Sequence, residues 1–243
     1  MEREAIMKER PILFSAPMVR AYLEGIKSQT RRTLKEQPTG DYIGYVLDST
    51  DKSLDGAFCF ELNIDDIMGV KYIHCPYGNP GDKLWGRETT EQDGNISDDI
   101  ISAMYSADHA PVFYSMSEYP EFDGSLAHWW YSRKTCPSIH MPRWASRINP
   151  QIISVRVERL NDISEEDAIA EGLSAITKDG ITVKYGIPDS DGLPGTDDHG
   201  WPWHEWDVDP RKAYRKLWES INGAGSWNVN PWVWVIEFKR VKT

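Results

Sequence analysis

The segment ILFSAPMVRAYLEGIKSQTRRTL, residues 12–34, changes character twice along its length. An apolar run at 12–14 predicts a short strand. Pro17, near the first helical turn, predicts that a helix follows, and Gly25 is placed to end that helix as a C-cap. The polar, Thr-rich stretch 28–34 predicts extended backbone. A strand, a helix and a second extended segment in succession indicate a mixed α/β fold.

Similar patterns further along the chain predict the rest of the core. They are a hairpin strand at 58–62, a strand at 83–88 after the turn-forming cluster 75–82, a half-buried strand at 151–160, a helix from an N-cap at Ser164 to about Glu171, a helix at 211–221 and a closing strand at 232–238. Three acidic, turn-rich insertions separate them: 36–70, 89–133, which shows no clear period, and 174–209, which we expect to be a loop or a flexible lid. The sequence shows no repeat and no interdomain linker. We therefore expect one domain over 1–243, with core segments at about 12–34, 81–88, 151–173 and 232–239.

The charge of the chain is acidic overall but unevenly spread. The formal net charge of −11 argues against a general nucleic-acid coat. Residues 8–35 and 133–159 each carry a net +5, whereas 41–66, 88–124 and 179–209 carry −6, −9 and −7. Two basic segments on an acidic chain favour a local anionic ligand such as a nucleotide, although for any one segment ordinary solvated charge is the simpler interpretation.

Hydropathy and cysteine content indicate the compartment. No apolar run approaches the ~20 residues that cross a bilayer, and the charged N-terminus lacks a secretory pattern. The three cysteines are an odd, sparse set that does not suggest a disulfide framework. We therefore expect a cytoplasmic protein with no membrane contact.

The order of the elements and several short motifs resemble the ASCH family of PUA-like β-barrels. The motifs are Gly25–Thr30, which fits Gly-x-Lys-x-x-Thr, then Gly81–Trp85, Ile163–Leu173 and the terminal Val235–Lys239. Together they cover about a third of the chain, spread from end to end. The resemblance implies an α+β fold: a PUA-like/ASCH β-barrel with flanking helices and several long insertions.

The chain is more closely similar to a longer ASCH-like group that is encoded by tailed bacteriophages and prophages. That similarity rests on Cys75–Gly78, Pro137–Trp144 and Trp218–Gly223. This similarity implies a fold and a location in the cytoplasm of a bacterial host. It does not imply a particular reaction, because one fold can host many activities.

Small bacterial ASCH proteins are amidohydrolases that remove the acyl group of N4-acetylcytidine, with a Lys and a Thr in the Gly-x-Lys-x-x-Thr turn and a Glu on the later helix. The resemblance assigns these catalytic roles to Lys27, Thr30 and Glu171. Glu165 and Glu166 lie close enough along the chain to replace Glu171 in that assignment, but acids in a first helical turn are more simply explained by the helix dipole.

Amide hydrolysis needs a nucleophile, a base that activates it and an acid for the leaving amine. A lysine such as Lys27 can take the proton of Thr30 if burial and nearby cations lower its pKa, and Arg31 and Arg32, predicted substrate contacts, supply such charges. Glu171 then donates to the cytosine amine or holds Lys27 in place. Alternatively, Lys27 and Glu171 activate a water while Thr30 positions the substrate. Positions 27 and 30 face opposite sides of a regular strand, so the catalytic hypothesis requires a turn or bulge there.

His140, Arg143 and Trp144 form a second predicted substrate-binding group. Arg143 offers a phosphate contact and Trp144 a stacking surface, a usual pairing for a single-stranded base. A buried Trp144 beside a surface Arg143 explains the pattern equally well.

The cysteines do not make a convincing metal site. Cys136 and His140 have a zinc-like spacing, but Cys75 with His74 beside it does not complete four ligands in close pairs. The His-x-Glu and Pro-Cys-x-x-Cys pattern of zinc deaminases is also missing from the sequence. We therefore expect no metal and no other cofactor.

The favoured hypothesis is an amidohydrolase that acts on a modified, N-acylated nucleobase, nucleoside or nucleotide. One alternative is a module that binds RNA or single-stranded nucleic acid in the same pocket without turnover. Another is a ribonuclease in which Lys27 and His140 act as cation and proton carrier. The sequence leaves open the acyl group, the base and the oligomeric state.

Overall fold

The computed structural model of the protein describes residues 8–64, 67–97, 100–114, 124–197 and 199–241. Its strands are β1 (Glu9–Leu13), β2 (Gln29–Thr33), β3 (Tyr42–Tyr45), β4 (Ala57–Ile64), β5 (Ile67–His74), β6 (Lys83–Arg87), β7 (Thr90–Ser97), β8 (Ile100–Tyr105), β9 (Thr135–Cys136), β10 (Pro150–Arg159), β11 (Ser174–Thr177), β12 (Val183–Gly186) and β13 (Trp232–Arg240). Its α-helices are α1 (Ala16–Leu23), α2 (Glu165–Ala170) and α3 (Pro210–Asn222), and short 3-10 turns lie at Lys52–Leu54, Ser138–His140, Arg143–Ala145, Leu160–Asp162 and Trp203–Glu205. The described chain is a mixed α/β fold made mostly of strands.

A five-stranded sheet in the order β1-β6-β10-β13-β2 forms the centre of the fold. β1 and β6 run parallel, whereas β10 pairs antiparallel with both β6 and β13, and β13 pairs antiparallel with β2. β2 is an edge strand of this sheet, opposite residues 233–237 of β13. The basic turn before β2 therefore lies at the margin of the central sheet.

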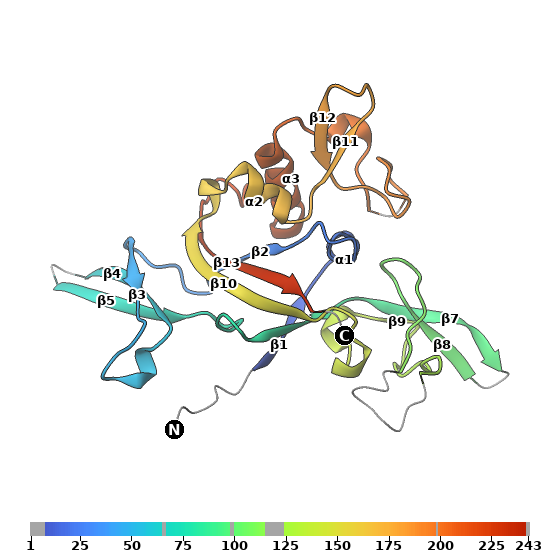
Figure 1. Ribbon diagram of the computed structural model, residues 1–243, viewed down its shortest axis with the longest axis horizontal. Coiled ribbons are helices and arrows are strands. Elements are labelled where there is room, and N and C mark those ends of the chain that lie inside the picture. Colours follow the sequence, from blue (N-terminus) through green and yellow to red (C-terminus); the bar gives the residue numbers. More distant parts are fainter. Residues whose placement is uncertain (1–7, 65–66, 98–99, 115–123, 198, 242–243) are drawn as a thin grey trace.

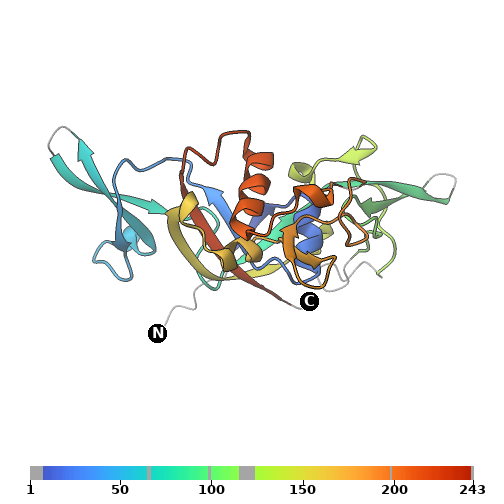
Figure 2. The same ribbon diagram turned by 90° about the horizontal axis from the view of Figure 1, so that it is seen from above.

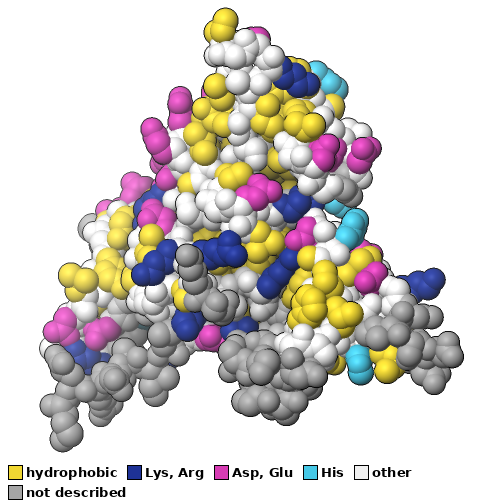
Figure 3. All heavy atoms as spheres, turned by 45° about the vertical axis from the view of Figure 1, so that its right-hand side comes forward, with side chains coloured by type: hydrophobic (Ala, Val, Ile, Leu, Met, Phe, Trp, Pro, Cys, Tyr) yellow, Lys and Arg dark blue, Asp and Glu magenta, His cyan; other side chains and the backbone are white. Residues whose placement is uncertain are grey.

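Two smaller sheets project to opposite sides of the central one, as Figures 1 and 2 show. One is β3-β4-β5 and the other β8-β7-β9, while α2, α3 and the β11–β12 hairpin lie together above the sheet in Figure 1. On the face drawn in Figure 3, Lys and Arg side chains (dark blue) gather across the middle of the molecule among hydrophobic side chains.

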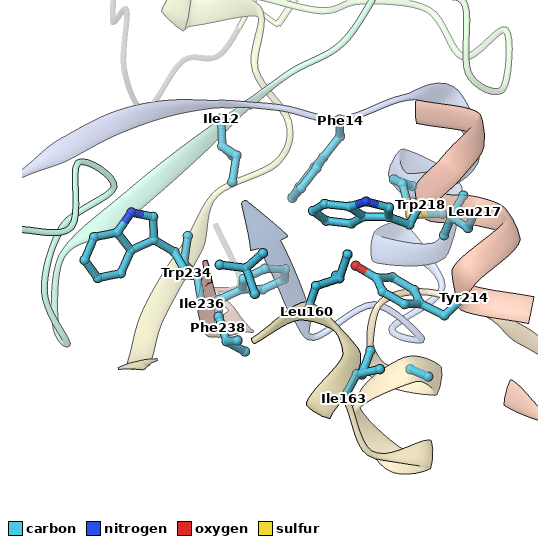
Figure 4. Packing of buried hydrophobic residues seen from close by; sticks show 14 of the residues in the cluster. Ile12, Phe14, Leu160, Ile163, Tyr214, Leu217, Trp218, Trp234, Ile236 and Phe238 are labelled. Atoms are coloured by element: carbon cyan, nitrogen blue, oxygen red, sulfur yellow. The ribbon is translucent and has the colours of Figure 1, made fainter. Parts of the chain in front are cut away.

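The core is organised around β13, whose run Trp232–Ile236 is buried throughout. A strand that is covered on both faces is expected to show a continuous apolar run instead of alternation. On one face Trp234 meets Phe58 of β4 at 4.9 Å between ring centroids, which joins the β3–β5 sheet to the core. Elsewhere in the core, α3 directs Tyr214, Leu217 and Trp218 toward Phe14 and Leu160 (Figure 4).

The predicted helix ends are confirmed. Gly25 follows α1 with φ +81°, a left-handed conformation that glycine adopts without a Cβ penalty. The Ser164 hydroxyl accepts a hydrogen bond from Asp167 N at 3.1 Å and so caps α2. α3 begins at Pro210 and ends at Asn222, followed by Gly223. The predicted strands at 83–88, 151–160 and 232–238 correspond to β6, β10 and β13.

The expected barrel is not seen. The described residues form several sheets and no closed barrel, because β1 and β2 remain the two edges of the central sheet. The mixed α/β class is thus confirmed at the coarse level only. No described helix is long and apolar enough to cross a membrane.

Two predicted insertions hold more regular structure than expected. The stretch 89–133 contains β7 and β8, whose pairing shifts register between residues 92 and 95 and again between 95 and 97, which explains the missing period. The stretch 174–209 contains the β11–β12 hairpin instead of only a loop. The side chains of Trp201 and Trp206 are buried in the core, and Trp206 Nε1 donates to the backbone carbonyl of Trp201 at 2.8 Å, so they anchor this segment.

Candidate functional site

A pocket of about 410 Å³ opens between the start of α1, strand β2 and helix α3. Its walls include residues from eight stretches of the chain: Leu13–Ala16 with Met18, Lys27, Thr30–Thr33, Glu88 and Thr89, Ser106 and Ala107, Ser138, Glu171, and Tyr214, Leu217, Trp218, Ile221 and Asn222. Five of the predicted site residues are therefore brought together in one cavity: Lys27, Thr30, Arg31, Arg32 and Glu171. The volume is in the range typical of small-molecule sites.

Lys27 lies in the turn between α1 and β2. The amides of Ile26 and Lys27 both donate to Ala21 O, at 2.9 and 3.0 Å, which closes α1 before β2 begins at Gln29. Ser28 N donates to Ala170 O at 3.0 Å and ties this turn to α2. The turn required by the spacing of positions 27 and 30 is therefore present.

Glu171 reaches the pocket from the C-cap position of α2. The next residue, Gly172, has φ +109°, and a Cβ on it would lie 3.1 Å from Ala21 Cβ and 3.4 Å from Lys27 Cβ. Glycine at 172 thus allows the ends of α1 and α2 to approach each other. Glu165 and Glu166 are exposed in the first turn of α2, so Glu171 is the carboxylate that this helix brings to the pocket.

Lys27 is buried and makes three contacts with acceptors. Its Nζ donates to Gln29 O at 2.8 Å, to Glu171 O at 2.6 Å and to the Glu171 Oε2 carboxylate oxygen at 3.2 Å. Burial lowers the Lys27 pKa to about 8; the Glu171 charge opposes this shift, and the positive charges of Arg32 and Arg31 add to it. The pKa of Lys27 is therefore closer to neutrality than that of an exposed lysine.

Arg31 is the most heavily paired cation of the pocket. Its guanidinium donates to Glu158 at 3.0 Å through Nε, to Asp167 at 2.8 Å and to Glu171 at 3.2 Å. Arg156 also pairs with Asp167 and Glu158. Lys27, Arg31, Glu158, Asp167 and Glu171 are called the Lys27 cluster below.

The acids of this cluster were partly missed from the sequence. Asp167 belongs to an acidic run that the helix dipole explained, and Glu158 lies in an alternating strand. The spacing of Arg156 and Glu158 in β10 was a usable signal, because residues two apart in a strand share a face and can form an ion pair. Arg156 and Glu158 indeed form an ion pair at 3.3 Å.

Thr30 is buried to 1% exposure, and its Oγ1 has no hydrogen-bond partner among the described residues. Two other residues of the pocket wall, Trp218 and Ser106, also have a buried side-chain polar atom without a partner in the part of the chain that is described. Buried polar atoms are nearly always hydrogen-bonded in native proteins, so these three groups are candidates for contact with a water or a ligand. An amine with a lowered pKa, a buried hydroxyl and a carboxylate can together support acyl transfer.

A second, partly buried ion-pair cluster borders the same pocket through Glu88 and was not predicted. Arg147 donates to both oxygens of Glu88, at 2.9 and 2.8 Å, and to both oxygens of Asp108, at 2.8 and 2.9 Å. Its guanidinium carbon lies 3.8 Å from the ring centroid of Tyr105. Burial raises the Glu88 pKa, although Arg147 opposes that shift. Glu88, Asp108 and Arg147 are called the Arg147 cluster below.

The remaining predicted contacts lie outside the pocket walls. His140 stacks on Tyr131 at 5.6 Å, and Arg143 pairs with Glu9 at 3.1 Å. Trp144 packs edge-on against Trp130 at 4.8 Å. Among the pocket-lining residues, Ser138 is the nearest neighbour in sequence to this group. A role for these three residues in substrate binding stays a prediction.

The thiols and carboxylates do not gather into a metal-binding set within the described residues. Cys75 and Cys136 are buried as free thiols, and burial raises the Cys75 pKa to about 11. A thiol with so high a pKa is a poor nucleophile near neutral pH.

No family model, no curated protein and no solved structure matches this chain. The resemblance to the ASCH family therefore stays a prediction from the sequence motifs.

Proposed function

We propose that the protein is an ASCH-type amidohydrolase with a PUA-like core, which removes an N-acyl group from a modified nucleobase, nucleoside or nucleotide in the cytoplasm. One observation carries the proposal: Lys27, Glu171 and Thr30 line one pocket and supply a buried amine, a carboxylate and a hydroxyl that has no partner among the described residues. These are the residue types that the reaction needs.

In this mechanism Lys27 is the base and Thr30 the nucleophile. The neutral amine, roughly a tenth of the population at pH 7 for a pKa of about 8, takes the Thr30 proton. The hydroxyl oxygen attacks the acyl carbon, and the C–N bond breaks as the Lys27 ammonium returns its proton to the leaving amine. Water, activated by Lys27, then hydrolyses the ester on Thr30 and releases the carboxylic acid.

Glu171 positions Lys27 and balances its charge. Its backbone and carboxylate oxygens both accept from Nζ, and its second carboxylate oxygen accepts from Arg31 at 3.2 Å. Trp218 Nε1, a buried donor of the same pocket, is available for the acyl oxygen on which negative charge develops. If water attacks directly, Lys27 and Glu171 activate it and Thr30 holds the substrate. The overall reaction is the same: water is consumed, and the amine and the carboxylic acid are released.

The pocket walls suit a planar base. Phe14, Tyr214 and Trp218 supply aromatic surface, while hydroxyls of Ser15, Thr33 and Ser106 supply hydrogen-bonding groups. Aromatic faces with a few placed polar groups are the usual way in which proteins hold single bases.

One observation favours the binding-module alternative. Lys27 Nζ faces three acceptors, a set that fully satisfies an ammonium. A permanent cation there would recognise a ligand without transferring a proton. The ribonuclease alternative has less support, because His140 does not line the pocket that contains Lys27.

The proposal is tested with a panel of N-acylated and unmodified nucleosides, bases and nucleotides, incubated with wild type and Lys27→Ala and analysed by mass spectrometry. We expect loss of the acyl mass from at least one substrate with wild type and not with Lys27→Ala. Turnover that survives Lys27→Ala in a protein free of host hydrolases would rule out the assigned centre.

A further inference from the structure

Arg32 differs from the other cations at the pocket. Its guanidinium donates to two backbone carbonyls, Leu13 O at 2.7 Å and Arg31 O at 3.1 Å. No carboxylate lies within ion-pair distance of it in the part of the chain that the structure describes. A guanidinium has five N–H donors, so several remain for a ligand while the two carbonyls hold its plane.

The neighbouring cations are neutralised. Lys27 pairs with Glu171, Arg31 with three carboxylates, and Arg147, just behind the wall, with Glu88 and Asp108. Arg32 is half-buried, whereas Lys27 and Arg31 are buried. Arg32 therefore places at a half-buried position of the pocket wall a positive charge that no described carboxylate pairs with.

The surroundings of Arg32 are suited to an anion. The carbonyl that anchors it belongs to Leu13, directly before Phe14 and the N-cap Ser15 of α1. Ser15 makes no side-chain capping bond, the first turn of α1 contains no acid, and residues 13–16 line the pocket. A helix start without a compensating acid adds positive potential to that of the guanidinium.

We infer that the substrate is a nucleotide, whose phosphate is bound by Arg32 while its base lies toward Lys27 and Thr30. This inference rests on the proposed function for the identity of the base, but the phosphate contact does not depend on turnover. A planar guanidinium binds phosphate through paired N–H donors, which a nucleoside cannot use. The phosphate belongs either to a free mononucleotide or to a phosphodiester of a strand.

Calorimetric titration with cytidine, cytidine 5′-monophosphate and a short single-stranded oligonucleotide tests the inference on wild type, Arg32→Gln, Arg143→Gln and Arg10→Gln. Arg143→Gln tests the competing prediction that Arg143 contacts the phosphate. Arg10→Gln is the matched control, since Arg10 lies outside the pocket walls and pairs with Asp82, and it should bind each ligand as wild type does. We expect the monophosphate to bind wild type about 10- to 100-fold more tightly than cytidine, because charge-assisted hydrogen bonds contribute on this scale. Arg32→Gln should remove that difference, and Arg143→Gln should retain it.

The outcomes separate the two proposals. Equal affinity of wild type for cytidine and its monophosphate overturns the inference, even if acylated nucleosides are hydrolysed. If phosphate binding depends on Arg32 but no acylated substrate is hydrolysed, the inference is supported and the proposed function is contradicted. If Arg143→Gln, and not Arg32→Gln, loses the preference, the phosphate site lies elsewhere and the inference is wrong.

Tighter binding of the oligonucleotide than of the monophosphate assigns the phosphate to a strand. Should Arg32→Gln fail to fold, the ratio of the two wild-type affinities, and its decrease with added salt, still decides the matter.

Discussion

The Lys27 cluster and the Arg147 cluster border the same pocket and are built from the same kinds of group, yet they differ in what remains free to react. In the Arg147 cluster, one guanidinium is clamped by both oxygens of Glu88 and of Asp108. An arginine keeps its proton at any physiological pH. This cluster therefore has the features of a structural support for the wall.

The Lys27 cluster contains a group that can lose its proton. It contains Lys27 beside the guanidinium of Arg31, and burial brings the Lys27 pKa to about 8. Thr30, whose hydroxyl has no partner among the described residues, lines the same pocket. Buried charge alone is thus a poor sign of a reactive site. A titratable cation near an unsatisfied hydroxyl is a better one.

The largest expected effect is on turnover when the Lys27 cluster is altered. Lys27→Ala and Thr30→Ala should each lower kcat/KM by about 10²- to 10⁴-fold, because each removes a part of the proton-transfer step. The double variant should be no worse than the more damaging single one, since the residues act as a unit. Steady-state kinetics check this, with Lys71→Ala, whose lysine pairs with Glu36 outside the pocket, as the control. Additive losses would contradict a shared catalytic step.

The next effect is on stability when the Arg147 cluster is broken. Arg147→Met should lower the free energy of unfolding by about 3–5 kcal/mol, because Glu88 is left buried without its partner. Adding Glu88→Gln should recover part of the loss. Chemical denaturation measures both, and Arg215→Met, which removes an exposed pair with Glu219, should change little. A small effect of Arg147→Met would mean that this cluster does not support the wall.

The pH profile should depend on the Lys27 cluster. Because the base must be neutral, kcat/KM should rise with pH and level off above a midpoint near pH 8. Arg32→Gln should move the midpoint upward, since the Arg32 charge lowers the Lys27 pKa, and Glu171→Gln should move it downward. Initial rates between pH 6 and 10 test this prediction. If neither substitution moves the midpoint, the group that titrates in the pH profile is not Lys27.

The smallest expected effect is the change in the free energy of unfolding when the Thr30 hydroxyl is removed. Thr30→Val keeps the shape and removes a hydroxyl without a described partner, so the free energy of unfolding should stay the same or rise by about 1 kcal/mol, while turnover is lost. Ser146→Ala is the matched control, because Ser146 Oγ donates to Gly86 O at 2.7 Å and its loss should destabilise. Thermal unfolding compares the two, and a marked destabilisation by Thr30→Val would indicate a structural role.

Local patterns in the sequence predicted the elements that hold Lys27 and Glu171. The helix stop at Gly25, the N-cap at Ser164 and the alternation of β10 depend on neighbouring residues, so they can be found in one sequence. The turn between positions 27 and 30 was expected from the chemistry and is present.

Pairings between distant segments were not predictable in the same way. Arg31 meets Glu158 only because β13 lies between β2 and β10, and Arg147 meets Glu88 across 59 positions. Such contacts depend on strand order and register, which no local pattern encodes. For the same reason the sequence grouped Arg143 and Trp144 with the pocket, whereas their partners are Glu9 and Trp130.

The most direct test of a reactive Lys27 is Lys27→Arg, assayed in parallel for turnover of an N4-acylated cytidine nucleotide and for binding of the deacylated product. Arginine keeps the positive charge but cannot act as a base at neutral pH. We predict that turnover falls nearly as far as with Lys27→Ala while the wild type remains active. Lys27→Arg that retains turnover, or a wild type that binds nucleotides and hydrolyses none while Lys27→Arg keeps the affinity, would contradict catalysis by Lys27.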